Sequence, residues 1–191
     1  MMIRYAVAAA LLVSVVAGCG GKEDPAVRVA AENIVKLGGS FTLHGLTVPI
    51  KTAVKIPKGI LRIQKVGLNH TQARDSDLEL LKPLTDLEIL ELQSTKITDA
   101  GLAHLQGLKG LRELDLYDCQ HISDKGLESL QSLPKLSKLE LSKTPLSDAA
   151  VDRLLMMKQL AQLSVNNTPL SADAGKKLRD GLPKCKVYGP K

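Results

Sequence analysis

The chain has 191 residues, enough for one domain, and its only aromatic residues are one Phe and three Tyr. A hydrophobic core must therefore consist mainly of Leu, Ile and Val. The formal net charge is +6. So few aromatic residues leave no face that combines stacking rings with basic side chains, and nucleic acid is therefore not expected as a partner.

The first residues indicate export. Arg4 supplies a positive charge, and residues 5–17 are an apolar run that is too short to span a bilayer comfortably. Residues 16–19, Val-Ala-Gly-Cys, resemble a bacterial lipobox, whose cysteine becomes the lipidated first residue of the mature protein. We therefore expect a lipoprotein signal peptide at 1–18 and lipidation of Cys19. An ordinary signal peptide with a chance cysteine is the alternative. Gly20 after the cysteine resembles the sorting signals for an outer membrane.

A short tether, residues 19–23, and a cap, residues 24–59, follow the leader. The tether reaches roughly 15 Å when extended, which would keep the protein close to a membrane. Asp24 and Pro25 are typical of a helix start, and Gly38-Gly39 is typical of a helix end. Short strands are predicted where apolar residues alternate with polar ones, at Phe41 and Leu43 and at Val54 and Ile56.

One pattern of apolar residues recurs about every 24 residues after the cap. A fixed period of this length predicts a solenoid, in which stacked units share one core. The third unit has one residue more than its neighbours, near Gln120-His121, where the loop should bulge. Five units are predicted at 60–83, 84–107, 108–132, 133–156 and 157–181, followed by a closing strand and tail at 182–191. The recurring core positions are Leu87, Leu90 and Leu92; Leu111, Leu114 and Leu116; Leu136, Leu139 and Leu141; Leu160, Leu163 and Val165; and, more weakly, Ile63, Val66 and Leu68.

This pattern resembles the leucine-rich repeat family, in its cysteine-containing and ribonuclease-inhibitor-like subclass. The resemblance also rests on helix signatures in the second half of three units, at 97–102, 122–127 and 146–151. It implies an α/β fold, a leucine-rich repeat solenoid with a curved parallel sheet inside and helices outside. Bacterial lipid-anchored repeat proteins look similar. The family binds many unrelated ligands, so the resemblance implies a binding module without naming its partner.

Three columns of polar residues are expected to hold the units together. Each column has one position per unit: a small residue that can bond the turn backbone, a helix N-cap, and an Asp at the helix start. The Asp column can compensate the helix dipoles, and a calcium ladder is the alternative. The columns are Thr71, Thr95, Cys119, Thr144 and Thr168; Thr98, Ser123, Ser147 and Ser171; and Asp75, Asp99, Asp124 and Asp148.

No combination of residues indicates catalysis. Cys119 and Cys185 lie three units apart, roughly 14 Å at the usual strand spacing, which is too far for a disulfide, so both thiols are expected to be buried and free. No catalytic or phosphate-binding motif is present, so we expect no enzyme, no cofactor and no small-molecule substrate. The histidines lack the spacing of a metal site: His44, His70, His104 and His121.

The exposed side of the strands is the predicted binding surface. Side chains alternate along a strand, so Leu90 and Leu92 should point inward and Ile89, Glu91 and Gln93 outward. Repeating this pattern gives an acidic face with one Tyr, which suits a cationic partner. The alternatives are that the charges keep an exposed sheet soluble and that the Tyr packs on its neighbours. The predicted partner-binding residues are Glu91, Glu113, Asp115, Tyr117 and Glu140.

These observations favour a membrane-anchored protein-binding module, exported to the bacterial cell envelope, with the outer membrane or periplasm preferred. The basic residues gather at the other end of the chain, where residues 176–191 hold six basic side chains and one acidic one. The alternative function is a structural envelope protein that contacts an anionic polymer or membrane through this end. A third interpretation is that the basic cap only keeps the solenoid end soluble.

Overall fold

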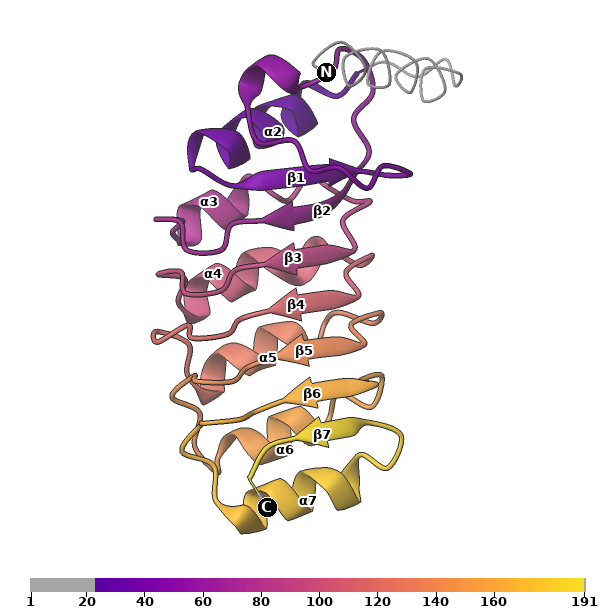
Figure 1. The fold of residues 1–191 in the computed structure, drawn as a ribbon. Coiled ribbons are helices and arrows are strands. Elements are labelled where there is room, and N and C mark those ends of the chain that lie inside the picture. The colour runs from indigo at the N-terminus through magenta and orange to yellow at the C-terminus, as the bar shows by residue number, and fades with distance from the viewer. Residues whose placement is uncertain (1–22, 191) are drawn as a thin grey trace, which may run out of the picture.

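The computed structural model describes residues 23–190, which form a stack of strands backed by helices (Figure 1). The predicted signal peptide, the lipidation site Cys19 and most of the tether lie outside the described residues. No helix within residues 23–190 has the length and apolar character needed to cross a membrane. One open sheet contains the strands in chain order. They are β1 (Ser40–Leu43), β2 (Ile63–Gly67), β3 (Ile89–Glu91), β4 (Glu113–Asp115), β5 (Lys138–Glu140), β6 (Gln162–Ser164) and β7 (Lys186–Tyr188).

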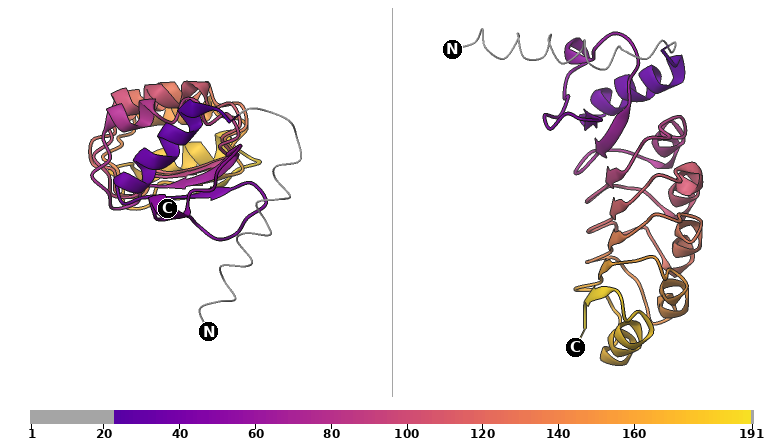
Figure 2. Two further views of the ribbon diagram at one scale, coloured as in Figure 1. Left: turned by 90° about the horizontal axis from the view of Figure 1, so that it is seen from above. Right: turned by 90° about the vertical axis from the view of Figure 1, so that its right-hand side faces the viewer.

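The sheet is parallel from β2 to β7, and β1 alone runs antiparallel to its neighbour. Strands lie on one side of the stack and helices on the other (Figure 2). This arrangement confirms the predicted α/β solenoid. The helices are α2 (Pro25–Lys36), α3 (Asp75–Glu79), α4 (Asp99–Ala103), α5 (Leu127–Leu130), α6 (Ala150–Leu155) and α7 (Ala172–Gly181), with 3₁₀ turns η1 (Ala53–Lys55), η2 (His104–Gly107) and η3 (Asp124–Gly126).

The predicted cap helix is confirmed as α2. It begins after Asp24, whose carboxylate accepts a hydrogen bond from the backbone N–H of Ala26 at 2.8 Å. It ends at Lys36, and Gly38 shortly after it takes a positive φ of 83° that glycine adopts without strain. The buried side of α2 consists of Ala30, Ala31 and Ile34, which close the end of the core.

The second strand predicted in the cap is wrong. Phe41 and Leu43 are buried in β1 as expected, but Ala53–Lys55 form the 3₁₀ turn η1. On the outer edge of β1, Ile50 alone pairs with the strand, through an isolated bridge to Phe41. Pro57 then follows Ile56, and proline has no N–H to donate to a sheet ladder. Val54 and Ile56 alternate as in a strand but have no neighbouring strand among residues 23–190 to pair with, so they do not form one.

The core is one continuous column of leucine layers. Each strand from β3 to β6 points one leucine inward at the same register, and the buried residue two positions later adds a second layer. Of the first layer, none is more than 1% exposed. Burial of such stacked layers is what stabilises a solenoid, because each unit contacts only its neighbours. The first layer is Leu90, Leu114, Leu139 and Leu163.

The column of small residues bonds the turns, as predicted. After each strand from β2 to β6 the chain turns through a non-glycine residue with positive φ, and the small residue follows. In four units a threonine hydroxyl donates to the carbonyl three residues earlier, at 2.5–2.8 Å. Cys119 differs, because its Sγ donates to the Leu92 carbonyl of the preceding unit at 3.2 Å.

The two cysteines are both free, but only one is fully buried. Cys119 is 0% exposed, in agreement with the prediction. Cys185 is half-buried, so the expectation of a second buried thiol is wrong. It precedes β7, which is the last strand of the sheet within the described residues 23–190. The extra residue of the third unit lies in an exposed loop at Gln120 and His121, where Gln120 Nε2 donates to the Lys143 carbonyl at 2.5 Å.

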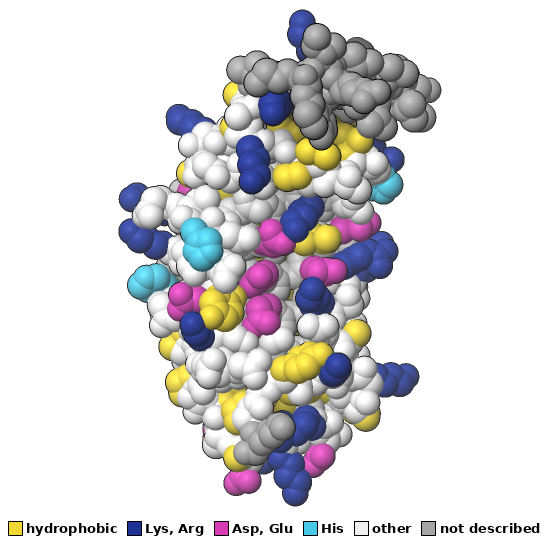
Figure 3. All heavy atoms as spheres, in the orientation of Figure 1, with side chains coloured by type: hydrophobic (Ala, Val, Ile, Leu, Met, Phe, Trp, Pro, Cys, Tyr) yellow, Lys and Arg dark blue, Asp and Glu magenta, His cyan; other side chains and the backbone are white. Residues whose placement is uncertain are grey.

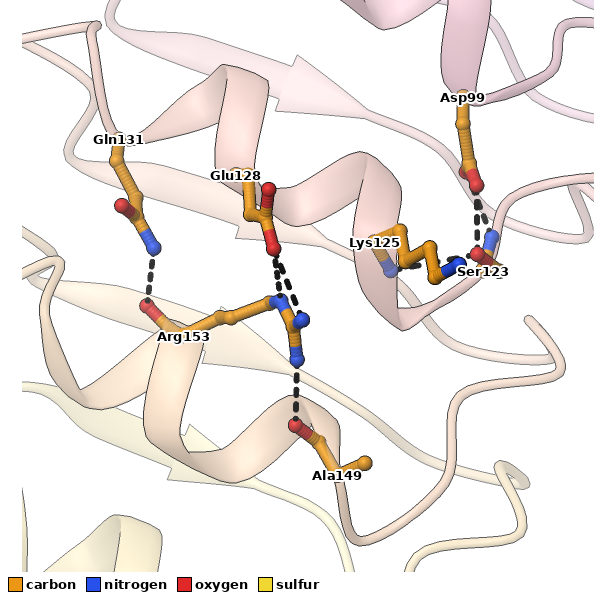
Figure 4. A network of polar contacts seen from close by, with 7 residues as sticks. All are labelled: Asp99, Ser123, Lys125, Glu128, Gln131, Ala149 and Arg153. Carbon is orange, nitrogen blue, oxygen red and sulfur yellow. Dashed lines mark hydrogen bonds and ion pairs between the residues drawn. The ribbon is translucent and has the colours of Figure 1, made fainter.

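The Asp column links neighbouring units. Each carboxylate accepts two hydrogen bonds from the N-cap residue of the next unit, one from the backbone N–H at 2.8–2.9 Å and one from the hydroxyl at 2.6–2.7 Å. Figure 4 shows one such pair, Asp99 and Ser123. These aspartates lie at helix starts, as dipole compensation predicts. Their hydrogen bonds, however, are made to the next unit. Among residues 23–190 no group of three His, Cys, Asp or Glu side chains could hold a metal ion. The pairs are Asp75–Thr98, Asp99–Ser123, Asp124–Ser147 and Asp148–Ser171.

Two glycines make room for this ladder. A Cβ atom on Gly101 would collide with the Asp75 carboxylate, and one on Gly126 would collide with the Asp99 carboxylate. The N-cap hydroxyls complete the arrangement, since each also accepts a backbone N–H of its own unit at 3.1–3.3 Å. The ladder therefore joins helix capping to the stacking of units.

Candidate functional site

The exposed side of β2–β6 is called the strand face here. Pairing between strands aligns its side chains in columns, as the sequence predicted. Pairing with β7 also extends the columns, because Lys186 follows Gln162 and Tyr188 follows Ser164. This extension was not predicted from the sequence, although the 24-residue spacing indicates both positions. The outer column is Lys65, Ile89, Glu113, Lys138 and Gln162, and the middle column is Gly67, Glu91, Asp115, Glu140 and Ser164.

Ion pairs divide the acids of the strand face into two kinds. Lys65 Nζ lies 2.5 Å from Glu91 Oε1, and Lys138 Nζ lies 3.2 Å from Glu113 Oε2. Within residues 23–190, neither Asp115 nor Glu140 forms an ion pair. Acidic side chains gather over the middle of this face (Figure 3). Two adjacent carboxylates are thus left without an ion-pair partner in the described part of the chain.

Asp115 is the most perturbed acid of the strand face. Its partial burial raises the pKa of the carboxyl, and repulsion from Glu140 and Glu91 raises it further. A hydrogen bond from the Tyr117 N–H to Oδ1, at 2.9 Å, and the charge of Lys138 act in the opposite direction. A cation placed beside Asp115 and Glu140 would relieve this repulsion.

Tyr117 lies at the edge of the acidic pair, under a lysine. Lys143 Nζ stands 5.0 Å from the centre of the Tyr117 ring, a cation–π distance. The ring is half-buried, so it packs on a neighbour and still presents part of its surface. A second pair of the same kind is Lys186 over Tyr188, also at 5.0 Å. The structure therefore brings all five predicted residues onto one face.

A further column follows the ends of the strands, and two of its side chains, Asn69 and Ser142, have a structural role. The column is Asn69, Gln93, Tyr117, Ser142 and Asn166. Asn69 Oδ1 accepts the backbone N–H of Gln93 at 2.8 Å, and Ser142 Oγ accepts that of Asn166 at 3.1 Å. Ser142 is 4% exposed. These side chains satisfy backbone groups that follow the short strands, so they offer little to a partner.

Comparison with known proteins agrees with this geometry. The family model described as "Leucine Rich repeat" matches residues 84–105 and 111–130. The fold is that of a leucine-rich repeat protein. No curated protein matches the chain.

Two solved leucine-rich repeat structures are similar over most of the chain. Internalin C2 of Listeria monocytogenes has 20% identity and a TM-score of 0.51, with 87% of this chain and 74% of that chain covered. The ectodomain of the receptor kinase SOBIR1 of Arabidopsis thaliana has 18% identity and a TM-score of 0.57, with 88% and 93% covered. At these identities the likeness concerns the fold alone.

Asparagine at position 115 should stabilise the leucine-rich repeat domain at neutral pH. The raised pKa of Asp115 means that the folded protein holds this proton more tightly than the unfolded chain does. The ionised carboxylate therefore lowers stability once the pH exceeds the raised pKa. Asp115→Asn should increase the free energy of unfolding at about pH 7, and the increase should vanish at about pH 3, below the pKa of an unfolded Asp. Urea unfolding at both pH values measures the difference.

Asp148→Asn is the matched control, and its effect on the free energy of unfolding should have the opposite sign. Hydrogen bonds from the N–H and hydroxyl of Ser171 lower the pKa of Asp148. Its stabilisation is present above the unfolded pKa and is lost as the pH falls through the folded pKa. This variant should be less stable than the wild type at neutral pH, and acidification should close the gap. Effects of the same sign in both variants would contradict the assignment.

Proposed function

We propose that this protein is a membrane-anchored binding module that presents its strand face to a protein partner and performs no catalysis. The leucine-rich repeat fold supports a protein-binding role. The observation that carries the proposal is the adjacent pair Asp115 and Glu140, which has no cation partner within residues 23–190 although neighbouring acids do. Two adjacent carboxylates without an ion-pair partner lower stability. Such a pair is expected where a cationic partner binds and neutralises it.

The chemistry of this face favours a partner segment that carries Lys or Arg. A positive side chain between Asp115 and Glu140 would neutralise both carboxylates. Tyr117 beside them offers a partly exposed ring, and Tyr is frequent among residues that dominate binding energy. Glu91 and Glu113 already hold lysines of this chain, so they would contribute to the field rather than to direct pairing.

The anchoring part of the proposal rests on residues 1–23. The apolar leader and the Val-Ala-Gly-Cys lipobox support export and lipidation at Cys19. They also support a bacterial cell envelope, with the outer membrane or periplasm preferred. The similarity to the cysteine-containing and ribonuclease-inhibitor-like subclass is part of the same proposal, since Cys119 occupies the small-residue column.

A second candidate function uses the basic C-terminal end. Lys176, Lys177 and Lys184 are exposed, and none of them forms an ion pair with another residue of 23–190. This surface would suit an anionic polymer of the envelope in a structural role.

Site-specific photocrosslinking in intact cells tests the proposal. A photoreactive residue in place of Gln93, which is two positions beyond Glu91 on the strand face, should give a crosslinked protein adduct. The same residue in place of Asp152, exposed on α6 on the helix side, is the matched control and should give none. Combining the Gln93 probe with Tyr117→Ala and Glu91→Lys should remove the adduct. An adduct that persists in that combination would refute binding by the strand face. A third probe replaces Lys184 in the basic C-terminal end, and an adduct formed only from that probe would favour the second candidate.

A further inference from the structure

The N-terminal cap exposes apolar side chains that the binding function does not use. Of the described residues, four large hydrophobic side chains are more than a third exposed, and two of them belong to the cap: Val29 at 48% and Val48 at 72%. Val29 stands on α2, and Val48 in the loop that joins β1 to Ile50. Because Ile50 pairs with the outer edge of β1, the first strand of the sheet, this loop lies at the N-terminal end of the stack.

Basic side chains surround these valines in the chain. Residues 23–59 contain five basic and three acidic residues. Arg28 is paired with Glu23, but the four lysines are exposed, and none forms an ion pair within the described part of the chain. A surface with exposed apolar side chains and lysines suits an anionic lipid membrane. The apolar side chains can enter the interface, and the lysines can contact the anionic headgroups. The lysines are Lys36, Lys51, Lys55 and Lys58.

The tether joins the molecule at this same end, and the junction is held in place. Glu23, the last tether residue, pairs with Arg28 of α2 and accepts the Gly59 N–H at 3.3 Å. Arg28 also donates to the Pro57 carbonyl at 2.7 Å, which fastens the chain after η1 to α2. From Cys19 to Glu23 the chain spans roughly 15 Å at most. A lipid on Cys19 would therefore bring the cap, rather than another surface, to the membrane.

We propose that the N-terminal cap rests on the anionic membrane surface that holds the lipid anchor, with Val48 in the interface. This inference rests on the anchor in the proposed function. The described chain begins at one end of the stack and finishes at the other (Figure 1). Six strand spacings separate β1 from β7, so the basic C-terminal end would stand about 29 Å further from that membrane. The strand face would then lie open to partners along the side of the stack. A second copy on the cap is a poorer occupant, because it would set lysines against lysines.

Fluorescence quenching in vesicles tests this contact. The lipidated full-length protein carries an environment-sensitive fluorophore on Val48→Cys, in phosphatidylethanolamine–phosphatidylglycerol vesicles with a lipid-borne quencher. Met156→Cys is the matched control, since Met156 is 68% exposed but belongs to the α6 end of the chain. Both use a Cys185→Ser background, because Cys119 is buried and lipidation leaves no thiol at Cys19. The Val48 probe should be quenched at least about twofold more than the Met156 probe.

Three outcomes would overturn the inference. Equal, weak quenching of both probes in protein that floats with the vesicles refutes the cap contact and leaves the anchor intact. A Val48 probe that is shielded from aqueous iodide, yet is not quenched by the lipid-borne quencher, shows that a protein or a second copy covers the cap. Protein that fails to float, and shows no fatty-acid label that Cys19→Ala removes, refutes the anchor and with it the contact.

Discussion

Reversing the charge of Asp115 and Glu140 on the strand face should weaken binding of the crosslinked partner by about 100-fold or more. This loss corresponds to about 2.7 kcal/mol. The double variant Asp115→Lys and Glu140→Lys removes two attractions for a cationic segment and places two like charges against it. Close charge pairs across interfaces contribute energies of this order, and repulsion adds to the loss. Titration of the purified partner against each protein measures the affinities.

The control keeps the change in net charge and moves it to the helix side. Asp152→Lys and Asp180→Lys alter exposed residues on α6 and α7, which form no ion pair within residues 23–190. Their affinity should stay within about twofold of the wild type at physiological salt, because screening limits charges at such separations. If both double variants lose the same affinity, net charge rather than the strand face decides binding.

Alanine at position 114 should lower the free energy of unfolding by about 2–5 kcal/mol, the usual cost of such a cavity. Leu114 is 1% exposed and pairs in register with Leu90 on one side and Leu139 on the other. A cavity here weakens two unit interfaces at once, because each unit of a solenoid contacts only its neighbours. Urea unfolding followed by circular dichroism gives the value.

Gln162→Ala is the comparison for this core substitution. Gln162 lies in the outer column of the strand face, on the exposed side of β6, so its truncation should change stability by no more than about 0.5 kcal/mol. A loss below about 1 kcal/mol for Leu114→Ala would show that the neighbouring layers collapse into the space. Two separate transitions would instead show that the stack divides at β4.

The local features of the fold were predictable because each depends on residues close in sequence. The Asp24 cap, the alternation in β1 and the hydroxyl N-caps all follow from preferences within a few residues. The strand expected at Val54 and Ile56 failed for the opposite reason. A strand needs a partner edge, and the local pattern does not say whether one is free.

The candidate site divides in the same way. Periodicity placed Glu91, Asp115 and Glu140 in one column, since the same position of each repeat falls in one column of a parallel stack. It did not predict that Lys65 would reach Glu91, or that Lys143 would cover Tyr117. Long side chains have several rotamers, so their partners depend on the three-dimensional surroundings.

For this protein the sequence by itself determined the solenoid, its register and the residues on each face. A repeat of about 24 residues with a two-residue alternation leaves one way to bury every leucine. Only the tertiary structure decided which carboxylates of residues 23–190 have no ion-pair partner, that the Asp column bonds the next unit, and that the cap exposes Val48. Those outcomes depend on atoms some 24 residues apart coming within hydrogen-bond distance, and spacing alone gives neither the direction nor the partner of such contacts.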